Sequence, residues 1–195
     1  MGSIICLMGK SSTGKDTIYK RLLEDPSCTL KKIVPYTTRP IRVGEKEGVE
    51  YHFTDEAGYL ALQSAGKIIE ARTYHTYHGI WRYFTVDDGQ IAKGENYLII
   101  GTLEAYSRMK RYFGTERMIP LLIELDDGLR LQRALDRERN QSQPRYEEMC
   151  RRFLADSEDF SEEKIREAGI EKRFVNDELD RCLGEIKAYL GERLQ

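Results

Sequence analysis

The sequence predicts an α/β fold in which a parallel sheet is flanked by helices. Three apolar runs, at residues 4–7, 97–100 and 119–125, have the length and composition of buried strands. Segments with helical spacing separate these runs, and the first run leads directly into a glycine-containing turn. Buried apolar strands that alternate with helices are typical of a parallel sheet covered on both faces.

The remaining elements are predicted from apolar spacing, capping residues and turn residues. Further helices are expected over residues 17–23, 56–65, 87–93, 103–112 and 178–194. Further strands are expected over residues 67–74, 81–86 and 173–175. Asp55 is positioned to cap the helix over 56–65, and Gly66 to end it. The densely charged segment 127–164 is predicted to be helical, with an interruption at Pro144.

The composition limits the classes of protein to which the chain can belong. Its 195 residues carry a formal net charge of -2, which argues against a general nucleic-acid or membrane-surface binder. No apolar run approaches the ~20 residues of a membrane span, and no signal peptide is visible before the first strand. Four cysteines lie scattered without metal-binding spacing, as is typical of reduced thiols. We expect a single cytoplasmic domain with small-molecule partners, and the sequence leaves its oligomeric state open.

Residues 9–15 read G-x-x-x-x-G-K between a predicted strand and a predicted helix, which is the setting of a phosphate-binding loop. Glycines let backbone N–H groups approach an anion closely, and the helix N-terminus that follows favours negative charge. Lys15 adds a mobile positive charge for the β- and γ-phosphates. We therefore predict a sheet of the P-loop NTPase type with ATP as the nucleotide. The residues expected to bind it here are Gly9, Ser11, Ser12, Thr13, Gly14, Lys15, Asp16 and Thr17.

Asp16 departs from this motif, because a Ser or Thr ordinarily follows the lysine and gives a hydroxyl to Mg²⁺. A carboxylate oxygen is an ordinary ligand for Mg²⁺, so Asp16 is predicted to bind the metal. Thr17 retains a hydroxyl one residue later.

Arginines are concentrated in the charged segment, at Arg133, Arg137, Arg139, Arg151 and Arg152. A solvated helix face, with pairing between residues four apart, accounts for such a segment. A closing lid, whose arginines neutralise charge on a transferring phosphoryl group, accounts for it as well.

The segment from Thr37 to Glu45, with Gly48, Tyr51 and Phe53 downstream, resembles the T-T-R-x-x-R-x-G-E-x-x-G-x-x-Y-x-F signature of guanylate kinases. The resemblance extends over nearly the whole chain. It implies a mixed α/β acceptor-binding insertion at residues 33–92 and a helical lid at residues 127–153. The core of this single guanylate-kinase-like domain would then comprise residues 1–32, 93–126 and 154–195.

The resemblance also implies roles for individual residues. Arg39, Arg42 and Tyr51 match the residues that grip the phosphate of the acceptor nucleotide, a task for which arginine forks are suited. Glu70 matches the acid that accepts the guanine N1 and N2 protons. Arg137 and Arg152 match lid arginines, and Asn176 matches a position near the donor adenine. The residues expected to carry catalysis, through positioning and charge neutralisation, are Lys15, Arg39, Arg137 and Arg152.

Several residues depart from the family pattern around the base and the metal. His78 replaces a phosphate-binding tyrosine, and Ile80 replaces a hydroxyl that contacts guanine O6. Ile100 and Thr102 replace two acids, one on the amino edge of guanine and one near the metal. His78 and Thr102 are still expected to line the substrate site. With a carboxylate gained at Asp16 and one lost at Ile100, the metal-side acid is predicted to have moved to the phosphate-binding loop.

Three functions remain open at this stage. The first is Mg²⁺-dependent phosphoryl transfer from ATP to a nucleoside monophosphate, with GMP as the expected acceptor. The second is a kinase for another phosphorylated acceptor such as ribose 1,5-bisphosphate, which Asp16, Ile80 and Thr102 favour. The third is a non-catalytic guanylate-kinase-like binding module, which would not need Lys15 or the charged lid.

Overall fold

A five-stranded parallel sheet forms the centre of the molecule in the computed structural model, which describes residues 2–76 and 79–194. In spatial order its strands are β2 (Leu30–Lys32), β7 (Asn96–Ile100), β1 (Ile4–Met8), β8 (Met118–Glu124) and β9 (Arg173–Val175). The predicted parallel α/β sheet is therefore confirmed, with β1 paired on both sides.

Alternate side chains of β1 pack on opposite faces of this sheet, because successive residues of a strand point in opposite directions. Ile5 and Leu7 pack in the cluster formed with α1 (Lys15–Glu24) and α7 (Leu179–Gly191). Cys6 and Met8 pack in the cluster formed with α3 (Leu103–Phe113) and α6 (Glu162–Glu167). Both faces are thus covered, which explains why the central strands read as uninterrupted apolar runs.

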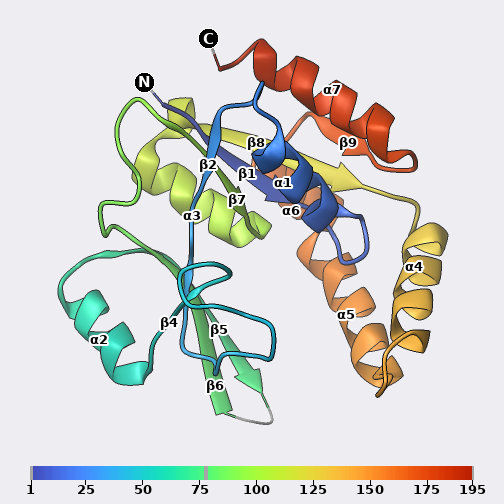
Figure 1. The fold of residues 1–195 in the computed structure, drawn as a ribbon, viewed down its shortest axis with the longest axis horizontal. Coiled ribbons are helices and arrows are strands. Elements are labelled where there is room, and N and C mark those ends of the chain that lie inside the picture. The colour runs from blue at the N-terminus through green and yellow to red at the C-terminus, as the bar shows by residue number, and fades with distance from the viewer. Residues whose placement is uncertain (1, 77–78, 195) are drawn as a thin grey trace.

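A second, four-stranded sheet lies beyond the end of the central one (Figure 1). Its order is β4 (His52–Phe53), β3 (Tyr36–Thr37), β6 (Gly79–Val86) and β5 (Ile68–Thr76). β5 and β6 are antiparallel, as are β3 and β6, whereas β3 and β4 are parallel. Beside it lies α2 (Glu56–Ser64), whose Asp55 cap accepts from the Gly58 N–H as predicted.

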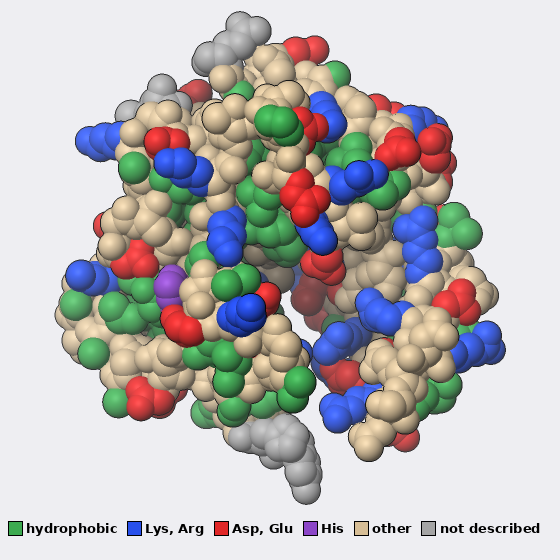
Figure 2. All heavy atoms as spheres, in the orientation of Figure 1, with side chains coloured by type: hydrophobic (Ala, Val, Ile, Leu, Met, Phe, Trp, Pro, Cys, Tyr) green, Lys and Arg blue, Asp and Glu red, His purple; other side chains and the backbone are tan. Residues whose placement is uncertain are grey.

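Two further helices, α4 (Asp127–Arg139) and α5 (Tyr146–Asp159), lie side by side and extend from the same end of the central sheet as the smaller sheet does (Figure 1). A short 3-10 turn, η1 (Thr115–Arg117), precedes β8. The space-filling view shows a cleft between the α4–α5 pair and the smaller sheet, with acidic and basic side chains at its rim (Figure 2).

The helix predicted over residues 87–93 is wrong. This segment contains bends and a turn, because the Asp88 side chain accepts from the Gln90 N–H at 3.0 Å and Gly89 has φ +91°. The Gln90 side chain in turn accepts from the Val34 N–H at 2.8 Å, which holds the segment that follows β6 against the coil that leads into β3. Among the described residues, no helix combines the length and apolar character needed to cross a membrane.

Candidate active site

The phosphate-binding loop runs from β1 into α1, and its glycines occupy positions that larger residues cannot. Gly14 has φ +85°, in the left-handed region, and a Cβ there would lie 2.4 Å from Asn176 Nδ2. A Cβ on Gly9 would lie 2.5 Å from a carbonyl oxygen of β8. Within the loop, the Thr13 hydroxyl donates to the Lys10 carbonyl at 2.9 Å. The predicted order of strand, loop and helix is therefore present, and the loop backbone depends on both glycines.

Asn176 is hydrogen-bonded to the backbone of this loop. It is only 3% exposed, and its Nδ2 donates to the Thr13 carbonyl at 2.7 Å. Its own backbone N–H donates to the Glu124 carbonyl at the end of β8, at 2.9 Å. The sequence led us to expect this side chain near the donor adenine; the structure has its amide group bonded to the loop backbone.

Arg130 ties the loop to both helices of the α4–α5 pair. It is 1% exposed, and its Nε donates to the Ser11 carbonyl at 3.0 Å. Its Nη2 donates at 3.1 Å to Asp156 of α5, and the same Asp156 oxygen accepts from the Ser11 N–H at 2.6 Å. Asp127 forms a further ion pair with Arg130. Sequence reasoning missed this network, which bonds to both the N–H and the carbonyl of Ser11.

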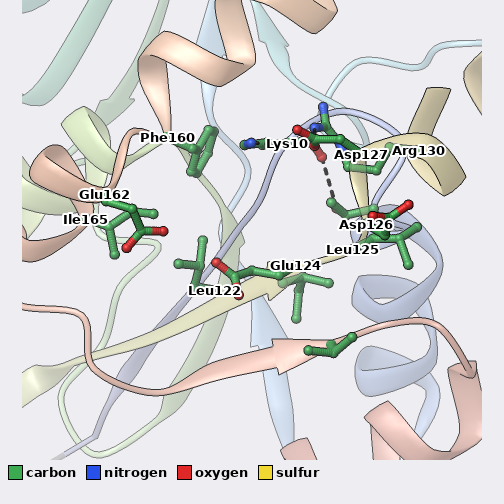
Figure 3. Close-up of a pocket in the computed structure, with 13 residues that line it drawn as sticks. Lys10, Leu122, Glu124, Leu125, Asp126, Asp127, Arg130, Phe160, Glu162 and Ile165 are labelled. Atoms are coloured by element: carbon green, nitrogen blue, oxygen red, sulfur yellow. Dashed lines mark hydrogen bonds and ion pairs between the residues drawn. The ribbon is translucent and has the colours of Figure 1, made fainter.

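A cavity of about 410 Å³ opens beside this network, at the carboxyl end of β8 (Figure 3). Lys10 and Asp127 meet at its edge with a nitrogen–oxygen distance of 3.5 Å. Phe160 and Ile165 give it apolar walls, and Glu162 contributes a carboxylate. The cavity thus adjoins the phosphate-binding loop at Lys10 and Thr13.

Of the predicted lid arginines, Arg137 is exposed on α4, and Arg152 on α5 bonds to Glu148 at 2.9 Å. Besides Arg130, the structure places Arg133 close to the loop, because its Nη2 donates at 3.3 Å to the carbonyl of Asn176. Its position four residues before Arg137 places both on one face of α4, which is the sequence signal that could have added it to the site.

On the other side of the cleft, Arg39 is buried in a cage. Its two Nη atoms donate to the two carboxylate oxygens of Glu45 at 2.7 and 2.6 Å. The guanidinium lies 5.0 Å from the ring centre of Tyr51 and 5.6 Å from that of Phe53. Arg39 is 3% exposed, and its Nε has no hydrogen-bond partner among the described residues. A buried donor without a partner is costly, so this atom points to an absent acceptor group.

The Arg39–Glu45 pair predicts part of the change in the free energy of unfolding at acidic pH. Hydrogen bonds from Arg39 lower the pKa of Glu45 from 4.5 to about 2. A carboxyl whose pKa is lowered by folding contributes its full stabilisation above its unfolded-state pKa, and loses it as the pH falls toward the folded value. We therefore expect the free energy of unfolding to fall between about pH 5 and pH 2, and to fall less steeply in Glu45→Gln.

Urea denaturation at a series of pH values measures this difference. Glu50→Gln, an exposed position in the same loop, is the control and should keep the wild-type slope. Equal slopes for the wild type and Glu45→Gln would show that Glu45 is not responsible.

The remaining acceptor-side residues are distributed as follows. Tyr51 is half-buried beside Arg39, whereas the Arg42 side chain is exposed and its backbone N–H donates to the Glu45 carboxylate at 2.8 Å. Glu70 is 2% exposed and accepts from the Thr85 hydroxyl at 2.9 Å. The Thr102 hydroxyl caps α3 by accepting from the Ala105 N–H at 3.2 Å. His78 lies outside the described residues.

On the metal side, Asp16 and Thr17 are exposed on the first turn of α1. The described residues contain no group of three or more acidic, histidine or cysteine side chains that would hold a metal alone. A single carboxylate fits Mg²⁺ here, because this ion is ordinarily held by one or two carboxylates together with substrate phosphates and water.

Comparisons with known proteins agree with this geometry. The family model described as guanylate kinase matches residues 1–82, which include the phosphate-binding loop, Arg39 and Glu70. A guanylate kinase of Anaplasma phagocytophilum (strain HZ) is 38% identical over 101 residues, covering 51% of this chain. One of Aromatoleum aromaticum (strain DSM 19018 / LMG 30748 / EbN1) is 34% identical over 135 residues, covering 66% of this chain. The chain is thus similar to guanylate kinases over the part that holds the candidate site.

The extent of the likeness differs among these guanylate kinases. The matched regions cover 47% of the Anaplasma relative and 64% of the Aromatoleum relative, so the chain spans less than two thirds of either. A guanylate kinase of Paraburkholderia xenovorans (strain LB400) is 27% identical over 194 residues, covering 97% of this chain and 79% of that protein. The crystal structure of guanylate kinase from Anaplasma phagocytophilum matches with a TM-score of 0.68 at 21% identity, covering 100% of this chain and 87% of that one. The predicted fold class is confirmed, and the similarities agree with the predicted resemblance to guanylate kinases.

Proposed function

We propose that this protein transfers the γ-phosphoryl group of ATP to a nucleoside monophosphate, with GMP as the acceptor. The observation that carries the proposal is the buried Arg39, whose Nε has no partner among the described residues and which lies in an aromatic and acidic cage. A phosphate oxygen of the acceptor would supply the missing partner. The phosphate-binding loop supports the donor side, and the similarity to guanylate kinases supports guanine as the base.

In this reaction an oxygen of the acceptor phosphate attacks the γ-phosphorus, a new P–O bond forms, and the bond to the β-phosphate oxygen breaks to release ADP. The acceptor oxygen is already substantially ionised at neutral pH, so no residue is assigned as a base. Arg39, Arg42 and Tyr51 would orient the acceptor phosphate. Lys15, with Arg137 and Arg152 from the α4–α5 pair, would neutralise charge on the transferring group.

We assign residues 33–92 to acceptor binding and residues 127–153 to a lid that closes over the nucleotides. Closure would exclude water and so limit ATP hydrolysis. The four cysteines of the structure are free, which supports a cytoplasmic location. Its partners would be small nucleotides.

Asp16 would hold Mg²⁺ together with the phosphate oxygens of ATP, and Thr17 offers a hydroxyl beside it. The ion supplies positive charge to the β- and γ-phosphates. We expect Asp16→Ala to lower Mg²⁺-dependent turnover by about 10²-fold, the effect of losing one preorganised group at a charged transition state. A Mg²⁺ titration of the steady-state rate measures this effect, and circular dichroism checks the fold.

Asp180→Ala is the matched control, because Asp180 is also an exposed aspartate in the first turn of a helix. It should leave the Mg²⁺ dependence unchanged. A wild-type rate in Asp16→Ala would reject the metal role.

A coupled ADP-release assay tests the function as a whole. The acceptors are GMP, dGMP, AMP, UMP and ribose 1,5-bisphosphate, each with ATP and Mg²⁺. Selective turnover of GMP or dGMP supports the proposal. Selective turnover of ribose 1,5-bisphosphate supports the second candidate. Thr102 favours this candidate, because it stands where the family pattern has an acid and its hydroxyl oxygen already accepts from the Ala105 N–H at the start of α3. Absence of both turnover and ATP binding leaves only a binding module.

A further inference from the structure

Arg72 and Glu70 form a largely buried pair in the acceptor-binding region. They lie two residues apart on β5, so both side chains point to the same face of the smaller sheet. The Glu70 side chain is 1% exposed and that of Arg72 is 16% exposed. Arg72 donates from Nε to one carboxylate oxygen of Glu70 at 3.2 Å and from Nη2 to the other at 3.4 Å.

We propose that Arg72 is a specificity-determining residue that donates to O6 and N7 of the acceptor guanine, beside Glu70, which accepts from N1 and N2. The inference rests on the proposed function. An arginine fork is the side chain best suited to O6 and N7 of guanine, because both are acceptors at the right spacing for two N–H groups. Adenine presents an amino group at the position of O6, so the same fork would face a donor.

The location of Arg72 agrees with this role. Burial raises the pKa of the Tyr51 phenol, and the positive charges of Arg39 and Arg72 both act on that phenol to oppose the rise. Arg72 bonds to Glu70 and lies opposite Tyr83 of β6, whose ring centre is 5.6 Å from that of Tyr51 in the Arg39 cage. A base whose edge meets Glu70 would therefore meet the guanidinium of Arg72 on the same face of the sheet.

The hydrogen bonds of the pair indicate how a ligand would displace Arg72 from Glu70. A charge-assisted bond between arginine and carboxylate is ordinarily about 2.7–2.9 Å long, whereas the two bonds of Arg72 are longer. Both oxygens of Glu70 accept from Arg72, and one also accepts from Thr85, so two guanine N–H groups compete with Arg72 for them. When the base binds, the fork turns from Glu70 to O6 and N7, and neither charge is left without a partner.

Arg72 would also compensate for Ile80, which carries no hydroxyl and cannot donate to a base. Ile80 is 49% exposed on β6, and its backbone partner in the sheet is His75 of β5. A site that has lost one donor to O6 retains guanine selectivity only if another donor reaches that atom. Arg72 is the guanidinium that lies against Glu70.

The test compares GMP with 7-deaza-GMP, in which a C–H group replaces N7 and the N1, N2 and O6 groups remain. For the wild type we expect kcat/KM to be roughly tenfold lower with 7-deaza-GMP, as for half of a bidentate contact. Arg72→Ala should lower kcat/KM for GMP by about 10- to 100-fold, mainly through KM, and should bring the ratio between the two acceptors close to one. The ratio of GMP to AMP turnover should fall as well.

Arg72→Lys guards against misfolding of the alanine variant, because it keeps a positive charge beside Glu70 but cannot form a bidentate contact. It should lose the discrimination against 7-deaza-GMP while unfolding at the wild-type temperature. Arg111→Ala, an exposed arginine on α3, is the matched control and should keep the wild-type ratio. If folded Arg72 variants discriminate as the wild type does, the inference is overturned while the kinase function stands. If the wild type does not phosphorylate GMP, the proposed function fails and the inference fails with it.

Discussion

Lys15→Ala is expected to lower kcat for phosphoryl transfer by at least about 10²–10³-fold, the size of effect that follows loss of one preorganised charge at a transition state. Lys15 is the first residue of α1, directly after the left-handed Gly14. Its ammonium group would reach the β- and γ-phosphates from this position. The other lysine of the loop, Lys10, pairs with Asp127 at 3.5 Å. Steady-state kinetics with saturating ATP and GMP measure kcat, and calorimetric titration measures ATP binding.

Lys20→Ala is the matched control for this experiment. Lys20 lies on the same helix, is 75% exposed and pairs weakly with Glu24 at 3.8 Å. Pairs of this kind contribute at most about 1 kcal/mol, so turnover should remain at the wild-type rate. Turnover by a folded Lys15→Ala variant at the wild-type rate would remove the donor side of the proposed function.

The central strands were predictable because each is buried on both faces. β1, β7 and β8 consequently appear in the sequence as continuous apolar runs, because a strand covered on both faces needs apolar side chains on both. β2 escaped prediction for the opposite reason. It lies at the edge of the sheet, is three residues long and carries two exposed lysines, which protect an edge from further pairing and leave no apolar pattern.

The candidate site shows the same division between local and distant signals. The phosphate-binding loop was predictable because its residues are consecutive and because Gly9 and Gly14 lie where a Cβ would clash with neighbouring atoms. The bond between Ser11 and Asp156 joins residues 145 positions apart, and no spacing rule reports it. The Arg39–Glu45 pair lies inside the recognisable segment, yet the sequence did not indicate that Glu45 would hold both Nη atoms.

The buried face of α4 carries two charged residues at helical spacing. Arg130 and Glu138 are buried eight residues apart, with buried Ala134 between them, whereas Leu129 and Leu131 are exposed. A helix that turns charged residues inward must give them partners, because an unpaired buried charge is strongly destabilising. Regular four-residue spacing of Arg130, Ala134 and Glu138 therefore predicts a polar network on the inner face, which the structure contains at Arg130.

Arg130→Met is expected to lower the free energy of unfolding by about 3–5 kcal/mol, as when one partner of a buried ion pair is removed. The variant would leave Asp156 without its cation and would take from Ser11 the donor to its carbonyl. Because Asp156 also accepts from the Ser11 N–H, loosening of this contact should weaken ATP binding together with stability. Urea denaturation and calorimetric titration with ATP measure the two effects.

Two further variants separate the buried network from a general loss of charge on α4. Arg139→Met removes an arginine that is 61% exposed on the same helix, and it should change the free energy of unfolding by less than about 1 kcal/mol. The double variant Arg130→Met with Asp156→Asn should recover part of the loss, because no uncompensated carboxylate remains at position 156. If Arg130→Met is as stable as Arg139→Met, the attachment of α4 and α5 to the phosphate-binding loop does not depend on Arg130. If the double variant regains stability but not ATP affinity, the two aspects of the network separate, and Arg130 acts on the nucleotide through the position of Ser11.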